Sequence, residues 1–98
     1  MLRVTEKAKE ALEKFLQKQE ADLEFAMRII YSPTEQEGLE LALDKERKGD
    51  LVIESDAGRK LLLIQSNLVT KLEGMTFYHK ETNHGISFVL SKPASQNG

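Results

Sequence analysis

The sequence contains no cysteine among its 98 residues. This absence excludes disulfide bonds, thiolate nucleophiles, and zinc or iron–sulfur sites that are ligated by cysteine. The sequence also lacks an excess of basic residues, because 14 lysines and arginines stand against 16 acidic residues and the net charge is -2. We therefore expect no binding to nucleic acid, which requires a basic face.

Long apolar segments are missing as well. The longest apolar run is Leu61–Ile64, whereas a membrane-spanning helix needs about 20 apolar residues. The first residues, Met1–Lys7, contain no apolar stretch typical of a secretory signal. We therefore expect a cytoplasmic protein that makes no contact with a membrane.

Hydrophobic periodicity predicts two helices. From Thr5 to about Gln19, apolar residues recur at helical spacing, and Thr5 is placed to cap the first turn. A shorter helix is expected from Ser66 to Glu73, with Ser66 as its cap and Gly74 as its left-handed end.

Six segments show strand patterns. In the first, alternation directs Leu23 and Phe25 toward the core and Arg28 toward the other face. The segment Lys60–Ile64 is apolar on both faces, so we expect it at the centre of a sheet. The six segments are residues 23–31, 39–44, 51–54, 60–64, 75–78 and 86–90. The aromatic residues expected in or beside the core are Phe15, Phe25, Phe77, Tyr78 and Phe88.

The order helix, four strands, helix, two strands predicts an α+β fold with mostly antiparallel strands. The connections between strands are mostly of hairpin length, so no long parallel crossover is expected. A chain of 98 residues, of which 40% are apolar, is long enough for one domain and too short for two. We predict one domain over residues 1–93 and a disordered tail over residues 94–98.

No group of residues forms a recognised catalytic motif. None of the serines lies in a Gly-x-Ser-x-Gly elbow, and the sequence contains no phosphate-binding loop and no dinucleotide fingerprint. We therefore predict that the protein is not an enzyme and has no cofactor, with no residue assigned to a catalytic, cofactor-binding or metal-binding site.

Two histidines are the first candidates for a metal site. His79 and His84 flank the last turn, and Glu81 lies between them. A metal site would need a further ligand, and the spacing matches no zinc motif. The simpler interpretation is that both histidines are polar residues at a surface turn.

A group of acidic residues is the second candidate. Oxygen ligands from Glu35, Glu37, Glu40 and Asp44 could hold a hard cation weakly, but their spacing lacks the calcium-loop pattern. A solvated loop and strand face is the simpler interpretation.

Several short motifs occur in a distinctive order along the chain. They are Val4–Ala8 before Leu12 and Phe15, Leu41–Asp44, Gly49–Glu54, Gly58 before an apolar strand, the run from Ser66 through Gly74 to Tyr78, His84–Phe88, and Pro93. In this order and spacing, over roughly residues 4–93, the chain resembles the HesB-like, IscA-type iron–sulfur carrier proteins. The resemblance implies a compact β-sandwich-like α+β fold that often dimerises, and a role in iron–sulfur cluster assembly or iron delivery.

The chain departs from this family at the ligand positions. Family members hold iron or a cluster with three cysteines, one in a Gly-Cys-(Ser or Thr)-Gly loop after the first strand and two in a Cys-Gly-Cys tail. Here the loop is the longer, acidic segment Ser32–Gly38 and the tail is Ala94–Gly98, so no ligand carries over. We therefore expect a noncatalytic binding or accessory module, as a homodimer or with a protein partner in iron–sulfur or metal homeostasis. The alternative is a metal- or small-molecule-binding domain that uses His79 and His84, or the loop Ser32–Gly38.

Overall fold

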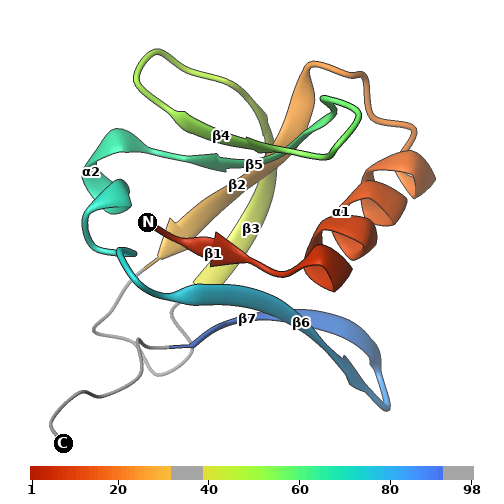
Figure 1. The fold of residues 1–98 in the computed structure, drawn as a ribbon. Helices are drawn as coiled ribbons and strands as arrows, with labels where there is room; N and C mark the ends of the chain where they lie inside the picture. Colours follow the sequence, from red (N-terminus) through yellow and green to blue (C-terminus); the bar gives the residue numbers. More distant parts are fainter. Residues whose placement is uncertain (32–38, 92–98) are drawn as a thin grey trace, which may run out of the picture.

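Seven strands and two helices make up the part of the chain that the computed structural model describes, residues 1–31 and 39–91. The strands lie in two sheets, and α1 packs beside both of them (Figure 1). In chain order the elements are β1 (Arg3–Val4), α1 (Glu6–Lys18), β2 (Phe25–Tyr31), β3 (Leu39–Lys45), β4 (Leu51–Glu54), β5 (Lys60–Ile64), α2 (Ser66–Val69), β6 (Thr76–Thr82) and β7 (Gly85–Ser91).

The larger sheet has the strand order β3-β2-β5-β4, and the smaller one has the order β1-β6-β7. The pairs β2–β3, β4–β5 and β6–β7 are antiparallel, which confirms the mostly antiparallel α+β prediction. The pairs β1–β6 and β2–β5 are parallel and were not expected. Strand β1 has only two residues, which is too short for any alternating pattern to be visible.

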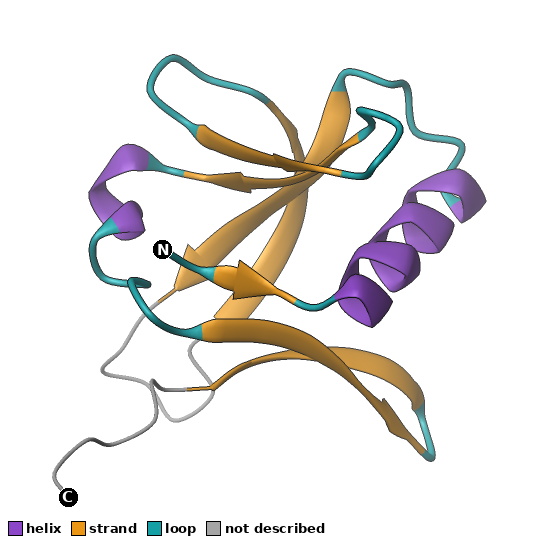
Figure 2. Cartoon of the chain, in the orientation of Figure 1, coloured by secondary structure: helices purple, strands orange, loops and turns teal. Residues whose placement is uncertain are grey.

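The connection from β3 to β4 also differs from the prediction. Its five residues, 46–50, have the length of a hairpin turn, but β3 and β4 do not pair and lie at opposite edges of their sheet. The connection must therefore pass across β2 and β5 (Figure 2). We call residues 46–50 the crossover.

Helix α1 has the capping and the buried stripe that its sequence predicts. The Thr5 side chain accepts a hydrogen bond from the Ala8 backbone N–H at 3.1 Å. Ala8, Leu12 and Leu16, which are spaced by four residues, are completely buried. Phe15 was expected in the core but is 40% exposed, because it lies beside this stripe rather than on it.

The core lies between α1 and the inner faces of the two sheets. All four residues of Leu61–Ile64 are buried, and β5 has a neighbouring strand on each side, as expected for a central strand. In the smaller sheet the buried ring of Phe77 stacks on Phe88 with 5.2 Å between ring centroids. The prediction for Leu23 was wrong, since β2 starts two residues later and Leu23 lies in the preceding turn, 76% exposed.

The second helix is shorter than predicted. It covers only Ser66–Val69, and Gln65 rather than Ser66 occupies the capping position, without a side-chain hydrogen bond. The chain then continues in turns to Gly74, whose φ of 79° confirms the expected left-handed end.

No helix among residues 1–31 and 39–91 is long and apolar enough to cross a membrane. The expected tail, residues 94–98, lies outside the described residues, and so does the loop Ser32–Gly38.

Candidate functional site

Arg28 is the one charged residue that the described part of the chain buries. It lies in the middle of β2 and is only 5% exposed. Alternation along β2 places it on the face of the sheet opposite the core, as the sequence indicated. This face is not open to solvent at Arg28, because Asp50 of the crossover contacts its guanidinium group. The neighbouring residues Ala26 and Leu63 are buried as well.

The guanidinium group of Arg28 holds both ends of the crossover. Its Nη1 and Nη2 atoms donate to the two carboxylate oxygens of Asp50, at 3.0 and 2.7 Å. Its Nε donates to Oδ2 of Asp44 at 2.7 Å, and Nη2 also donates to the carbonyl oxygen of Lys45 at 3.2 Å. Asp44 and Lys45 end β3 and Asp50 precedes β4, so one side chain fixes where the crossover leaves one edge strand and reaches the other.

Further hydrogen bonds complete this network. Asp50 Oδ2 accepts the backbone N–H of Arg47 at 2.7 Å, and Asp44 Oδ1 accepts the backbone N–H of Lys45 at 2.7 Å. The Arg47 side chain donates to Asp44 Oδ2 at 2.8 Å. Among the described residues no buried side-chain nitrogen or oxygen lacks a hydrogen-bond partner. The network therefore meets the condition under which a buried charge is tolerated.

The charges of the network reinforce one another. The hydrogen bonds from Arg28 hold the pKa values of Asp44 and Asp50 below those of ordinary aspartates. In turn, the two carboxylates raise the pKa of Arg28, chiefly through the hydrogen bonds with Asp50. All three groups are therefore charged near neutral pH. We define Arg28, Asp44 and Asp50 as the arginine clamp.

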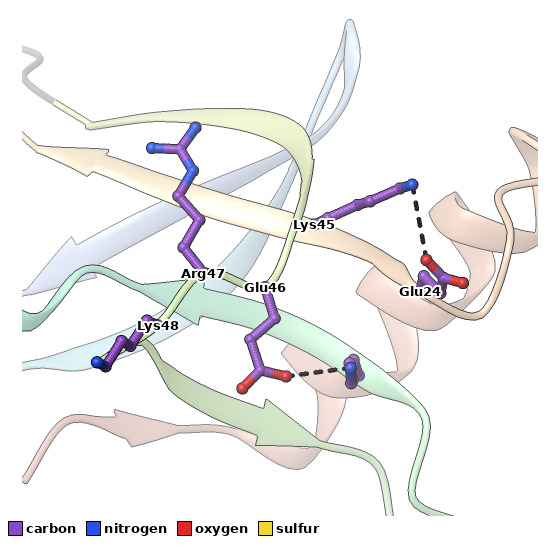
Figure 3. Close-up of a pocket in the computed structure, with 6 residues that line it drawn as sticks. Glu24, Lys45, Glu46, Arg47 and Lys48 are labelled. Atoms are coloured by element: carbon purple, nitrogen blue, oxygen red, sulfur yellow. Dashed lines mark ion pairs between the residues drawn. The ribbon is translucent and has the colours of Figure 1, made fainter.

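Residues Glu46–Lys48 of the crossover form one wall of an open pocket of about 350 Å³ (Figure 3). Four of the six lining residues are basic, although basic residues make up only 14 of the 98 in the chain. The lining residues are Glu24, Lys45, Glu46, Arg47, Lys48 and Lys60. We call this hollow the charged pocket.

Ion pairs connect the walls of the charged pocket. Lys45 Nζ lies 3.6 Å from a carboxylate oxygen of Glu24, and Lys60 Nζ lies 3.1 Å from one of Glu46. Both pairs are partly exposed, and exposed pairs of this kind contribute about 0–1 kcal/mol. They are thus weak enough to exchange their partners for charged groups on another molecule. Figure 3 shows Lys48 extending away from both pairs.

A second hollow, of about 420 Å³, lies between the end of α1 and the turn joining β4 to β5. Leu16, Ala21 and Leu23 supply apolar surface to it. Arg59 lies at its edge, where its Nη1 atom donates to the carbonyl oxygens of Leu23 at 3.0 Å and Phe25 at 2.8 Å. These bonds hold the turn before β2 against the start of β5.

The structure does not bring the two histidines together. His79 lies inside β6 opposite Phe88, whereas His84 lies in the turn after β6. Three residues of extended strand separate His79 from that turn, a length of about 10 Å. Among the described residues no three His, Asp or Glu side chains are grouped so that they could hold a metal ion.

The acidic candidates separate as well. Glu40 is an exposed residue of β3, and Asp44 belongs to the arginine clamp, while Glu35 and Glu37 lie outside the described residues. The arginine clamp was not predicted from the sequence. Its only visible signal was a single arginine inside the otherwise apolar strand β2, followed by Asp44 and Asp50 at the two ends of a short connection.

Comparison with known proteins found no matching family model and no matching curated protein. Several solved structures do share the fold. Escherichia coli SufA, described as involved in biosynthesis of iron–sulfur clusters, has a TM-score of 0.74 at 20% sequence identity, covering 96% of this chain and 87% of SufA. IscA with its [2Fe-2S] cluster has a TM-score of 0.64 at 20% identity, covering 98% of this chain and 88% of IscA.

A protein from Aquifex aeolicus, solved by solution NMR, has a TM-score of 0.65 at 25% identity, covering 94% of this chain and 91% of that protein. The likeness to all three structures therefore extends over almost the whole of this chain and over most of each compared protein. It confirms the fold that the sequence motifs implied. The chain is similar in its whole fold to SufA and IscA, and it has this fold without a single cysteine.

Proposed function

We propose that the protein is a noncatalytic accessory module of iron–sulfur cluster assembly, which acts by binding another protein and not by ligating a cluster through cysteine. The observation that carries this proposal is the combination of a SufA- and IscA-like fold over at least 94% of the chain with the absence of cysteine. Iron–sulfur clusters are held mainly by thiolates, and neutral hydroxyl groups are poor substitutes.

The charged pocket is the surface best suited to such binding. Its four basic and two acidic side chains include weak, partly exposed ion pairs. The arginine clamp fixes both ends of the crossover, so the backbone that carries Glu46, Arg47 and Lys48 is already ordered before a partner arrives. Preorganisation of this kind reduces the entropy cost of association.

Anaerobic reconstitution tests the first half of the proposal. The purified protein is incubated with ferrous iron and sulfide, desalted, and examined by visible absorption and by analysis of iron and sulfide per chain, with E. coli SufA treated in parallel. We expect the protein to stay colourless while SufA takes up a cluster. A stoichiometric cluster spectrum from this chain would contradict the proposal.

A delivery assay tests the second half. The rate at which cluster-loaded IscA transfers its cluster to an apo-acceptor is measured with and without the protein. We expect the protein to change this rate, and we expect Lys48→Glu in the charged pocket to weaken the change. Lys71→Glu is the matched control, since Lys71 is exposed and is not among the residues lining the pocket. A rate that does not respond to the wild-type protein would remove the accessory role.

A further inference from the structure

The charged pocket and the second hollow share a boundary. Lys60 lines both of them. Leu23 lines the second hollow, and the next residue in the chain, Glu24, lines the charged pocket. Consecutive residues lie about 3.8 Å apart along the backbone, so the two hollows meet at a boundary about one residue wide. Together they form one site with an apolar half and a charged half, which we call the bipartite site.

Arg59 holds this boundary in place. Its Nη1 atom donates to the carbonyl oxygens of Leu23 at 3.0 Å and Phe25 at 2.8 Å, and to that of Lys60 at 3.3 Å. These bonds tie the turn before β2 to the start of β5, and the two segments together border both halves of the bipartite site. The relative position of the two halves is therefore set before a ligand binds, which reduces the entropy cost of binding.

The apolar half exposes a large hydrophobic side chain. Leu23 is 76% exposed, more than any other large hydrophobic residue in the described part of the chain. A single exposed leucine is ordinary in a folded protein, but Leu23 borders a hollow of about 420 Å³ that Leu16 and Ala21 also line. An apolar group bound in this hollow would remove apolar surface of both molecules from water. The second hollow therefore favours a ligand that carries an apolar group.

The bipartite site is cationic on a chain that is acidic as a whole. Its lining carries five basic side chains and three glutamates, a net charge of +2, whereas the whole chain has a net charge of -2. The potential at a surface follows the charges nearest to it, and it raises the local concentration of ligands of the opposite sign. The basic side chains are Lys45, Arg47, Lys48, Arg59 and Lys60.

We propose that the bipartite site binds a short linear segment of a partner protein, in which several aspartates or glutamates flank one large apolar residue. The apolar side chain lies in the second hollow beside Leu23, and the carboxylates pair with Lys48 and with the lysines of the weak ion pairs. This inference rests on the proposed function, because it specifies the partner that the charged pocket receives. An apolar half beside a cationic half favours a peptide over a nucleic acid, whose phosphates would use the cationic half alone.

Selection from a library of random nine-residue peptides displayed on phage tests the class of ligand. The wild-type protein is immobilised, and the peptides that it retains are sequenced. Because the boundary is narrow and an extended peptide advances about 3.3 Å per residue, we expect enriched sequences to place two or more acidic residues within about four positions of a large apolar residue. No enrichment, or enrichment of sequences that lack either feature, would overturn the proposal.

Fluorescence anisotropy of the most enriched peptide, labelled with fluorescein, locates the site. Leu23→Ser should weaken binding by about tenfold or more, because it removes the apolar contact. Lys48→Glu should weaken it by a similar factor, and added salt should weaken binding to the wild-type protein. The matched controls are Ile86→Ser and Lys71→Glu, at exposed positions outside both hollows, and they should leave the affinity unchanged. An affinity that is indifferent to Leu23→Ser or to Lys48→Glu would contradict the proposal.

NMR of the wild-type protein keeps the test decisive if a variant folds poorly. Addition of the same peptide should shift the amide signals of residues 21–24, 45–48 and 57–60 most, and those of α2 little. A 20-nucleotide poly(U) RNA is then added as a competitor. Displacement of the peptide by an equal concentration of this RNA would show that the site recognises negative charge alone, and would overturn the proposal, as would shifts confined to other residues.

The outcomes also separate this inference from the accessory role. Peptide binding is measured without any cluster. A peptide that binds as expected, with no effect of the protein on delivery from IscA, would remove the accessory role and keep the bipartite site. A changed delivery rate without peptide binding would remove the bipartite site and keep the accessory role.

Discussion

Replacing Arg28 with methionine should cost the protein a large part of its stability. Methionine keeps an unbranched apolar side chain on β2 but removes every hydrogen bond that the guanidinium group makes to the crossover. The carboxylate of Asp50, whose side chain is only 2% exposed, is then left without a counterion. Removing one partner of a buried ion pair typically costs about 3–5 kcal/mol. A domain of this size has a total stability of about 5–15 kcal/mol.

Urea unfolding followed by circular dichroism measures this loss. With an m value of about 1–3 kcal/mol/M for a small domain, the midpoint of the Arg28→Met variant should fall by roughly 1 M or more. Lys18→Met at the exposed end of α1 is the matched control and should change the free energy of unfolding by no more than about 0.5 kcal/mol.

A double-mutant cycle separates two contributions to this cost: the loss of the attraction between Arg28 and Asp50, and the burial of the Asp50 carboxylate without a counterion. Asp50→Asn keeps an oxygen that can accept the Arg47 backbone N–H but removes the charge. If the buried, unpaired carboxylate of Asp50 accounts for most of the cost, the double variant Arg28→Met, Asp50→Asn should be more stable than Arg28→Met alone. A cost below about 1 kcal/mol for Arg28→Met would refute the reasoning, because it would show that the crossover keeps its place without the clamp.

Three further outcomes follow from the same contacts. Arg28 lowers the pKa values of Asp44 and Asp50 in the folded state. The stabilisation that results is complete above the unfolded pKa near ~3.9 and is lost as the pH falls through the folded pKa values. The free energies of unfolding of wild type and Arg28→Met, measured as the pH is lowered, should therefore converge at low pH. Thr5→Ala should cost about 1 kcal/mol in urea unfolding through loss of the α1 cap, and Thr5→Ser should restore most of it. Gly49→Ala should cost about 1–2 kcal/mol because its φ is +88°, even though the added methyl group meets only an ordinary contact, which thermal unfolding can check.

The parts of the fold that the sequence predicted well are those with a strong local pattern. Helix α1 shows its capping threonine and its apolar stripe within one segment, so its bounds were predicted to within one residue at each end. The apolar run Leu61–Ile64 correctly indicated a central strand. In both cases the information lies within a few adjacent residues, where periodicity is a direct consequence of backbone geometry.

The errors arose where the structure depends on distant segments. The length of residues 46–50 suits a hairpin turn, and only the order β3-β2-β5-β4 shows that they cross a sheet. Alternation correctly placed Arg28 on the face opposite the core, but no local pattern could show that another segment would cover that face. The arginine clamp therefore could not be predicted from local patterns, because Arg28 and Asp50, which it joins, lie 22 residues apart in the sequence.

The arginine clamp also bears on how the fold persists without cysteine. The described core consists of aliphatic and methionine side chains and Phe77, on which the partly buried Phe88 stacks, and the crossover is held by charge and hydrogen bonds. None of these contacts uses a thiolate, since the chain has no cysteine. A shared fold can carry different sites, so ligand positions can differ between proteins with the same packing. The similarity in fold to SufA and IscA is thus compatible with a function that does not depend on cysteine, and our proposal assigns that function to the charged pocket.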